Sequence, residues 1–376
     1  MESWPVETGL DHADLPDAPE VWRAMIDGAE RSLDFLEFYA ATEPDGRLEP
    51  VLAAIERAAA RGVRVRFVFD AAFHARMPEI PDRLAAIEGV EVRVYDFGAR
   101  GGGVQHAKLF VVDGAEAFVG SQNFDWRSLT HIQELGLRVS HPALVAAVAD
   151  LFAFDWALAG GASLQEARAA LPDRPSRFPV AARFAGAPVR VTPVASPRGW
   201  LPDEARWEWP AIREALEGAR ARIRIQVMSY HLRGHEGDEW RALDEALRAA
   251  AARGVRVSLI VSHWDQRPER AADLQALQRV DGIEVRFVTI PPASSGFIPF
   301  ARTIHAKYLT VDGDWAWIGS SNASGDYFLR SRNAGFVVEG APFAARLDAF
   351  FDDLWSGPHA EPVDPARAYE APRVAE

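Results

Sequence analysis

The sequence predicts an α/β protein of two similar lobes, each an α-β-α sandwich around a mixed β-sheet, related by a pseudo-twofold axis. Helix-like and strand-like segments alternate along the chain, which is typical of this class. Most segments of the first half recur in the second half. The 376 residues, 48% of them apolar and 25% charged, are also enough to bury two cores.

The internal repeat covers most of the chain. Ala58–Asp70 recurs as Ala250–Ser262, and Glu88–Val94 recurs as Asp281–Phe287. This period is far longer than the roughly 20–50 residues of repeat arrays, so it indicates the duplication of a whole domain. We therefore expect an N-terminal lobe at 1–157, a connector rich in Gly, Ala and Pro at 158–190, and a C-terminal lobe at 191–376.

Each lobe is expected to begin with two helix–strand pairs. The first is an amphipathic helix and a strand rich in apolar and β-branched residues. In the first lobe this helix is expected at 20–31 and this strand at 31–39. In the second lobe they are expected at 210–220 and 221–230. A second helix, near 48–60 and 239–252, leads into an Arg-Gly-Val-Arg-Val strand. Gly62 and Gly254 are placed to end these helices, because glycine readily adopts the left-handed conformation found there.

A β-hairpin follows in each lobe. Apolar strands flank an Asp-Gly dipeptide, at Asp113-Gly114 and at Asp312-Gly313, and this dipeptide favours a tight turn. We expect Asp113 and Asp312 to be structural, because acids at such turns usually accept hydrogen bonds from backbone amides. A closing strand and a helix then complete each lobe, at 135–139 and 142–156, and at 335–339 and 342–355.

The two hairpins carry the same six residues at the same spacing. After the His come Lys at +2, Asp at +7, Gly at +14, Ser at +15 and Asn at +17, and only ten histidines occur in the chain. The sets are His106, Lys108, Asp113, Gly120, Ser121 and Asn123, and His305, Lys307, Asp312, Gly319, Ser320 and Asn322. Side chains two apart on a strand share a face, and the hairpin returns Ser and Asn to the end where His and Lys lie.

Two such sets facing each other suit the cleavage of a phosphate diester. Lysine and asparagine side chains would hold the non-bridging oxygens. One imidazole would attack phosphorus and form a phosphohistidine, while the other protonates the leaving oxygen and then activates water or an alcohol. This chemistry needs neither a metal nor another cofactor. We assign catalysis to His106, Lys108, His305 and Lys307, and phosphate binding to Asn123, Asn322, Ser121 and Ser320.

The two copies differ at one position that bears on these roles. Glu134 lies 28 residues after His106, whereas Asn333 lies 28 residues after His305. A carboxylate on the far ring nitrogen would orient a histidine and stabilise it as a cation. We therefore expect Glu134 to support His106 as the nucleophile. His305, with only the amide of Asn333 in the equivalent place, would be the general acid and base.

The doubled pattern HxKxxxxDxxxxxxGSxN resembles the signature of the phospholipase D superfamily, over nearly the whole chain. Segments such as GSQNFDWRSLTHIQELGLRV and IPFARTIHAKY look like those of the lysosomal phospholipase D-like 5′ exonucleases. The resemblance implies phospholipase D-type sandwich lobes with one shared active site. That group is known for cleaving single-stranded nucleic acid, and lipid transphosphatidylation is also attributed to it. That group has a membrane anchor and cysteines. This sequence has no cysteine and no anchor-like apolar start, so we expect the targeting of that group not to carry over.

The resemblance makes single-stranded nucleic acid, cleaved from an end, the leading substrate. The alternative is hydrolysis or exchange of phospholipid head groups, as in a phospholipase D or a cardiolipin-synthase-like transphosphatidylase. Phe297, Ile298 and Phe300 lie where the second copy is longer; they would stack on bases in the first case and enter a bilayer surface in the second. Packing of this loop on the other lobe is equally compatible with the sequence. A non-catalytic module that only binds phosphate is a third hypothesis, which two intact motifs disfavour.

Composition and charge limit the binding partners, the nucleophile and the cellular location that we expect for the protein. The formal net charge of −13 weakens a role in binding long duplex nucleic acid, although a local basic cleft is compatible with it. The absence of cysteine excludes disulfides and thiol nucleophiles. The N-terminal residues have no signal-peptide pattern, and we expect no membrane span. A cytoplasmic location is the default expectation.

Overall fold

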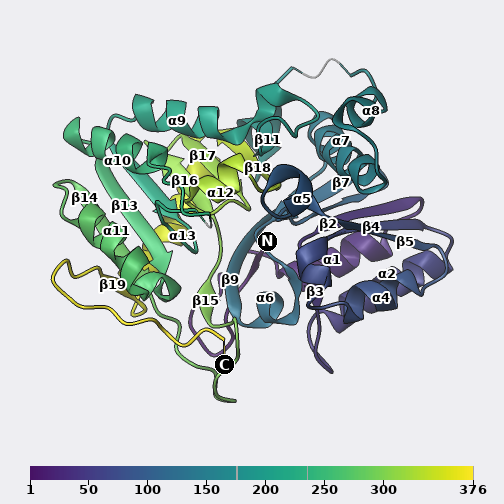
Figure 1. Ribbon diagram of the computed structural model, residues 1–376, viewed down its shortest axis with the longest axis horizontal. Coiled ribbons are helices and arrows are strands. Elements are labelled where there is room, and N and C mark those ends of the chain that lie inside the picture. The colour runs from purple at the N-terminus through teal and green to yellow at the C-terminus, as the bar shows by residue number, and fades with distance from the viewer. Residues whose placement is uncertain (175–176, 235, 376) are drawn as a thin grey trace.

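The computed structural model describes residues 1–174, 177–234 and 236–375. Figure 1 shows two β-sheets side by side, each flanked by helices, with the first lobe in purple to blue and the second in green to yellow. The predicted two-lobed α/β fold is confirmed: eight strands form the first sheet and nine form the second.

The first lobe is built on one mixed sheet. Its strands are β1 (Glu2–Ser3), β2 (Ser32–Glu37), β4 (Arg64–Asp70), β5 (Val90–Tyr95), β6 (Leu109–Val112), β7 (Glu116–Gly120) and β9 (Ile132–Val139), with β15 (Thr303–Ile304) from the second lobe. The order is β1-β9-β7-β6-β2-β4-β5, and β15 pairs with β9. Strands β2, β4 and β5 are parallel, and β6 and β7 form the predicted hairpin. Two short strands, β3 (Ala40–Ala41) and β8 (Phe124–Asp125), pair separately.

The helices of the first lobe follow the predicted order, with short additions. They are α1 (Ala18–Asp27), α2 (Glu49–Ala60), α3 (Ala71–His74), α4 (Glu79–Ala85), α5 (Phe97–Gly101), α6 (Trp126–Thr130) and α7 (Pro142–Ala159). Gly62, just after α2, has a φ of 87°, as expected for a glycine that ends a helix. Helices α3 to α6 were not predicted, because four to seven residues are too few to show a helical period.

The second lobe repeats this plan with a nine-stranded sheet. Its strands are β10 (Val180–Phe184), β11 (Ala187–Ser196), β12 (Arg222–Gln226), β13 (Arg256–Ser262), β14 (Ile283–Val288), β16 (Tyr308–Val311), β17 (Trp315–Gly319), β18 (Asn333–Glu339) and β19 (Ala360–Pro362). Its helices are α9 (Glu208–Gly218), α10 (Ala242–Ala252), α11 (Pro268–Gln278), α12 (Gly325–Leu329) and α13 (Ala341–Ser356), with 3-10 turns at Glu204–Arg206 and His263–Gln266. The order is β10-β11-β18-β17-β16-β12-β13-β14-β19.

The segment expected to be a connector, 158–190, is partly built into the lobes. Helix α8 (Leu164–Ala169) packs on α7, and β10 pairs with β11 at the edge of the second sheet. Its Gly, Ala and Pro content suggested only a connector between the lobes, but Val180, Ala182 and Phe184 alternate along β10 and pack against the core. The alternation of apolar residues at every second position, which is typical of a strand, was therefore more informative than the Gly, Ala and Pro content.

Helices α7 and α13 belong to one apolar core that joins the lobes. Leu144 and Phe152 of α7 share a cluster with Phe343 and Phe350 of α13 and with residues of both sheets. Helix α7 has the length and mean hydropathy, 1.6, of a membrane span, which the sequence analysis did not anticipate. Half of that segment is buried, and α7 packs on β5, β6 and β11, so its composition is also that of a core helix.

The two hairpin turns are held by their aspartates, as expected. Asp113 and Asp312 have positive φ values of 55° and 53°. The Asp113 carboxylate accepts hydrogen bonds from three consecutive backbone N–H groups that end at the first residue of β2, at 2.7–2.9 Å. Asp312 accepts three equivalent bonds from N–H groups that end at the first residue of β12, at 2.8–2.9 Å. Each aspartate thus ties a hairpin to the start of a neighbouring strand.

Replacement of Asp312 by alanine should lower the free energy of unfolding by about 2 kcal/mol at pH 7, because three N–H groups lose a charged acceptor. Burial raises the pKa of Asp312, but the three N–H donors outweigh it and leave the pKa below its usual value. The carboxylate therefore stabilises the fold above the unfolded-state pKa and stops doing so as the pH falls through the folded-state value.

Urea denaturation at pH 7 and near pH 3 measures both effects. Asp314→Ala is the matched control, since Asp314 is exposed in the same turn. Equal stability of Asp312→Ala and Asp314→Ala at pH 7 would contradict the proposed role of Asp312.

Candidate active site

The histidines and lysines of the two motifs meet between the lobes. His106 and His305 line one cavity of about 540 Å³. Lys108 and Lys307 are fully buried behind them, and each donates a hydrogen bond to the backbone carbonyl of the histidine two residues earlier. The structure therefore brings both predicted catalytic pairs into a single site.

Each histidine is positioned by a strand of the opposite lobe. The residues before His305 form β15, which runs parallel to β9 of the first lobe. The His305 N–H donates to the Gln133 carbonyl, at 2.8 Å, and the His106 N–H donates to the Arg332 carbonyl, at 2.9 Å. The lobes thus exchange strand contacts at the site.

This exchange overturns the predicted partner of Glu134. Glu134 Oε2 lies 2.7 Å from Nδ1 of His305, and Asn333 Oδ1 lies 2.9 Å from Nδ1 of His106. The expectation that Glu134 supports His106 is wrong, because it paired residues within one copy of the repeat. The closing strand of each lobe instead faces the histidine of the other.

The hydrogen-bond network around Asn333 assigns the tautomer of His106. Asn333 Nδ2 donates to the carbonyls of Tyr327 and Ser331, at 2.9 and 3.3 Å, so its Oδ1 is the atom that faces His106. The Ser320 hydroxyl also donates to this oxygen, at 2.9 Å. An acceptor opposite Nδ1 places the hydrogen on Nδ1 and leaves the lone pair of a neutral His106 on Nε2.

The two motif serines do not reach the cavity, contrary to the predicted contact with phosphate. The Ser121 hydroxyl exchanges hydrogen bonds with the backbone of Leu135, both at 3.1 Å. The Ser320 hydroxyl accepts from the Ala334 N–H, at 3.2 Å, besides donating to Asn333. Both serines brace the closing strands β9 and β18, which carry Glu134 and Asn333.

The two motif asparagines are placed differently from each other. Asn123 lines the cavity, and its Oδ1 has no hydrogen-bond partner among the described residues. Asn322 is fully buried, and its Oδ1 accepts a bond of 3.3 Å from the Ser229 N–H. Its Nδ2 also lacks a partner in the described part of the chain. Buried amides with unused atoms are suited to a polar ligand.

Burial dominates the electrostatics of the site. It lowers the pKa of His106 and His305 well below the usual range, and the neighbouring Lys108 and Lys307 lower it further. It also lowers the pKa of both lysines, that of Lys108 to about 7, and raises the pKa of Glu134 to about 7. An anionic phosphodiester would offset the lysine charges and favour their protonated form.

The value of kcat/KM should therefore pass through a maximum near pH 7. Lys108 carries its charge below its pKa of about 7 and loses it above, whereas Glu134 is charged only above its own pKa of about 7. The Lys108→Arg variant should lose the alkaline decline, because guanidinium stays charged. A monotonic profile from pH 5 to 9, with chemistry rate-limiting, would contradict this.

Aromatic side chains form the walls of the cavity. They come from the carboxyl ends of parallel strands, where α/β sheets usually bind ligands. Phe38 and Tyr39 follow β2, Phe73 follows β4, and Trp264 follows β13. The apolar but non-aromatic Met228, after β12, also lines the cavity. These residues were not predicted to lie in the site, although their position at or just after the ends of predicted strands could have indicated it.

The longer loop of the second copy reaches the mouth of the cavity. Phe300 lines it and is 50% exposed, Phe297 is 38% exposed, and Ile298 is half-buried. The guanidinium of Arg373 lies 3.8 Å from the ring centre of Phe297. The loop also touches the N-terminal segment, since Ser294 donates two hydrogen bonds to the Glu7 carboxylate.

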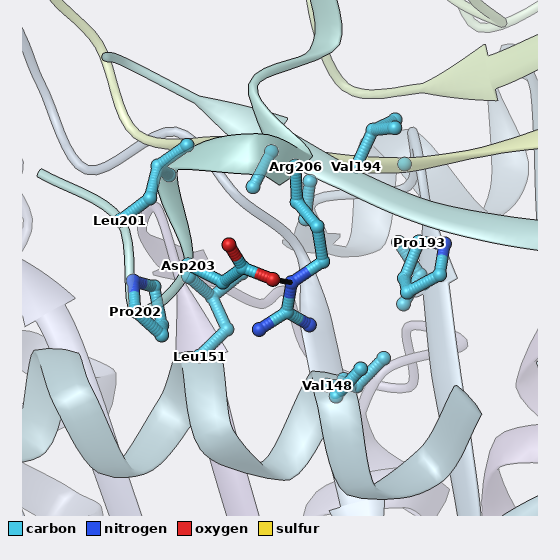
Figure 2. Close-up of a pocket in the computed structure, with 13 residues that line it drawn as sticks. Val148, Leu151, Pro193, Val194, Leu201, Pro202, Asp203 and Arg206 are labelled. Atoms are coloured by element: carbon cyan, nitrogen blue, oxygen red, sulfur yellow. Dashed lines mark ion pairs between the residues drawn. The ribbon is translucent and has the colours of Figure 1, made fainter. Parts of the chain in front are cut away.

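A second hollow between the lobes contains none of the motif residues. It is lined by apolar side chains such as Val148 and Leu151 of α7 and Val194 of β11 (Figure 2). Asp203 and Arg206 also line it and form an ion pair of 3.4 Å (Figure 2). Its volume of about 20 Å³ holds about one water molecule, so it is a packing gap.

Comparisons with known proteins agree with this geometry. The family described as "Cardiolipin synthase, PLD-like domain" matches residues 22–156 and 212–355. Phospholipase D Z of Dictyostelium discoideum is 30% identical over 375 residues, which cover 92% of this chain and 86% of that protein. The 5'-3' exonuclease PLD3 of Homo sapiens is 28% identical over 397 residues, covering 96% and 79%.

The fold is also that of a known structure. Phosphatidylserine synthase from Haemophilus influenzae matches with a TM-score of 0.65 at 12% identity, over 93% of this chain and 85% of that one. The family match covers most of both lobes, and the relatives match nearly end to end. The chain therefore belongs to the phospholipase D superfamily and is a phosphodiesterase.

Proposed function

We propose that this phosphodiesterase cleaves single-stranded nucleic acid from an end. The observation that carries the proposal is the aromatic lining of the catalytic cavity, which includes Phe38, Phe73, Trp264 and Phe300 beside the two histidines. Aromatic faces bind unpaired bases by stacking, largely without regard to sequence. The relatives named 5'-3' exonucleases support the same substrate class. A cavity of about 540 Å³ suits the end of a strand better than its middle.

The first chemical step is attack by His106. Its neutral imidazole has the Nε2 lone pair free, because Nδ1–H faces the amide oxygen of Asn333. Nε2 forms a bond to phosphorus as the bond to the leaving oxygen breaks. His305 supplies the proton to that oxygen. Burial lowers its pKa in the free site, but the Glu134 carboxylate at its Nδ1 and the anionic phosphodiester both favour its charged form once substrate is bound. His106 thus keeps its expected role for a different reason: the nucleophile must begin neutral and the acid must begin protonated.

The second step returns the enzyme to its starting state. Neutral His305 takes a proton from water, whose oxygen bonds to phosphorus as the bond to His106 Nε2 breaks. Lys108, Lys307 and the amides of Asn123 and Asn322 are the groups that would stabilise charge on the non-bridging oxygens. With the phosphate product still bound, His106 is again neutral and His305 is again protonated.

A second candidate function is hydrolysis or head-group exchange of phospholipids. It is favoured by the exposure of Phe297 and Phe300 at the mouth of the cavity, where they would enter a bilayer surface with Ile298. The two functions differ in the use of the two phenylalanines. Phe300 lines the cavity and would stack on a base, whereas Phe297 lies outside the cavity lining.

A panel of three substrates tests the proposal: 5′-labelled single-stranded DNA, phosphatidylcholine vesicles and bis(p-nitrophenyl) phosphate. We expect Phe300→Ala to raise KM for DNA about tenfold, since stacking on one base is worth about 1–3 kcal/mol. Turnover of the nitrophenyl ester should be unchanged, and Phe297→Ala is the matched control. Cleavage of vesicles but not of DNA, with losses in both variants, would favour the lipid function instead.

Cleavage of bis(p-nitrophenyl) phosphate should continue undiminished in excess EDTA. The histidines supply the nucleophile and the proton, and the lysines supply positive charge, so no step requires a metal ion. The rate is measured before and after prolonged dialysis against EDTA. Loss of activity that Mg²⁺ or Zn²⁺ restores would indicate a metal-assisted mechanism instead.

A further inference from the structure

The first-lobe wall of the cavity is a continuous row of side chains that leads outward from the nucleophile. The ring of Phe38 lies edge-on to His106, with 4.9 Å between ring centres. Phe73 packs on Phe38 at 3.9 Å, and the guanidinium of Arg76 lies 5.7 Å from the centre of the Phe73 ring. Arg76 is thus separated from His106 by two aromatic rings along one wall.

Arg76 brings a positive charge to this row, and no acidic side chain in the described part of the chain pairs with it. It is exposed, and its side chain makes no hydrogen bond or ion pair with the described residues. Arg127 also lines the cavity, but the Asp125 carboxylate accepts its Nε–H at 3.0–3.1 Å. In a chain of net charge −13, a cation on the cavity wall with no partner among the described residues attracts an anion.

Because of its position, Arg76 would bind an anionic group other than the phosphate that is cleaved at His106. Lys108 and Lys307 are fully buried behind the histidines and serve the phosphorus that His106 attacks. Arg76 lies at the exposed end of the wall, beyond Phe38 and Phe73. A substrate with a single phosphate, once held at His106, therefore leaves Arg76 unused.

We infer that Arg76 binds a second phosphate of the same nucleic acid strand, one that lies outside the cleaved bond. This inference rests on the proposed nuclease function. A single strand carries a phosphate at every nucleotide, so bases stacked on the aromatic wall bring further phosphates to its outer end. Arg76 would then distinguish strands from small phosphodiesters by affinity, without taking part in bond cleavage.

Two substrates that differ in phosphate number test the inference. Thymidylyl-thymidine has one phosphodiester, and a thymidine pentanucleotide without terminal phosphates has four. We expect Arg76→Gln to raise KM for the pentanucleotide about fivefold, as for an exposed ion pair, with kcat unchanged. KM for thymidylyl-thymidine should not change. The slope of log(kcat/KM) against log salt concentration should fall by about 0.7 for the pentanucleotide.

Two further variants test whether the effect depends on the charge of the side chain at position 76 or on its place in the wall. Arg76→Lys should keep the salt slope, because the charge remains. Arg64→Gln removes the same charge from the exposed start of β4, at the opposite end of that strand from Phe73, and should change nothing. The inference is overturned if Arg76→Gln weakens both substrates equally, or if Arg64→Gln reproduces its effect.

Failure of the proposed function would look different. In that case the wild type would cleave bis(p-nitrophenyl) phosphate but neither thymidine substrate, and the inference about Arg76 would fall with it. Cleavage of the pentanucleotide with an unchanged KM in Arg76→Gln would overturn only the inference. Unchanged thermal unfolding of Arg76→Gln is expected, since the side chain is exposed.

Discussion

His106→Ala and His305→Ala are each expected to lower kcat for an oligonucleotide by at least about 10³-fold. His106 is the proposed nucleophile, and without it no covalent intermediate forms. His305 is the proposed proton donor, and without it the leaving alkoxide departs unprotonated. Because the two lobes build one site, the double variant should be little slower than either single variant.

Single-turnover rates and far-UV circular dichroism measure this effect and check the fold. His359→Ala is the control, since His359, which follows α13, is not among the residues that line the catalytic cavity. Near-native turnover in either single variant would show that one lobe acts alone, which the shared cavity does not allow.

Glu134→Gln is expected to slow oligonucleotide cleavage by about 10²-fold or more, because a neutral amide no longer stabilises the protonated form of His305. The loss should depend on the leaving group. Nitrophenolate departs without a proton, so the initial burst from bis(p-nitrophenyl) phosphate should be nearly unchanged. The later steady state should still slow, because water attack also requires His305.

The matched variant is Asn333→Asp, which puts a carboxylate beside the other histidine. It should favour the protonated form of His106 and so remove the lone pair that attacks phosphorus. We therefore expect it to reduce the burst that Glu134→Gln leaves intact. Mass analysis of trapped enzyme should find phosphate on His106. Phosphate on His305 in the wild type, with a burst abolished by Glu134→Gln, would exchange the two roles.

Local features of the site could be predicted from the sequence. The spacing within each hairpin is set by a tight Asp-Gly turn, so His106, Lys108 and Asn123 had to come close together whatever surrounds them. The structural role of Asp113 and Asp312 is local in the same sense, because a turn carboxylate reaches the nearest free N–H groups. The duplication also predicted two lobes around one site.

Contacts between segments far apart in the chain could not be predicted this way. Ser121 and Ser320 have hydroxyls that suit a phosphate equally well, and only the packed strands direct them to the backbone of β9 and β18. The aromatic wall arises because Phe38 and Phe73 follow two different strands that the sheet places side by side. Neither arrangement produces a regular residue spacing in the sequence from which it could be predicted.

The sequence by itself determined the chemistry of this protein, because two matched sets of His, Lys and Asn allow few other reactions. Only the tertiary structure decided which histidine Glu134 serves. The distance of 28 residues is the same in both copies, but β15 crosses to pair with β9 and brings His305 to Glu134. Hydrogen bonding between strands depends on their alignment in space, and an internal repeat is equally compatible with pairing inside a lobe or across the two.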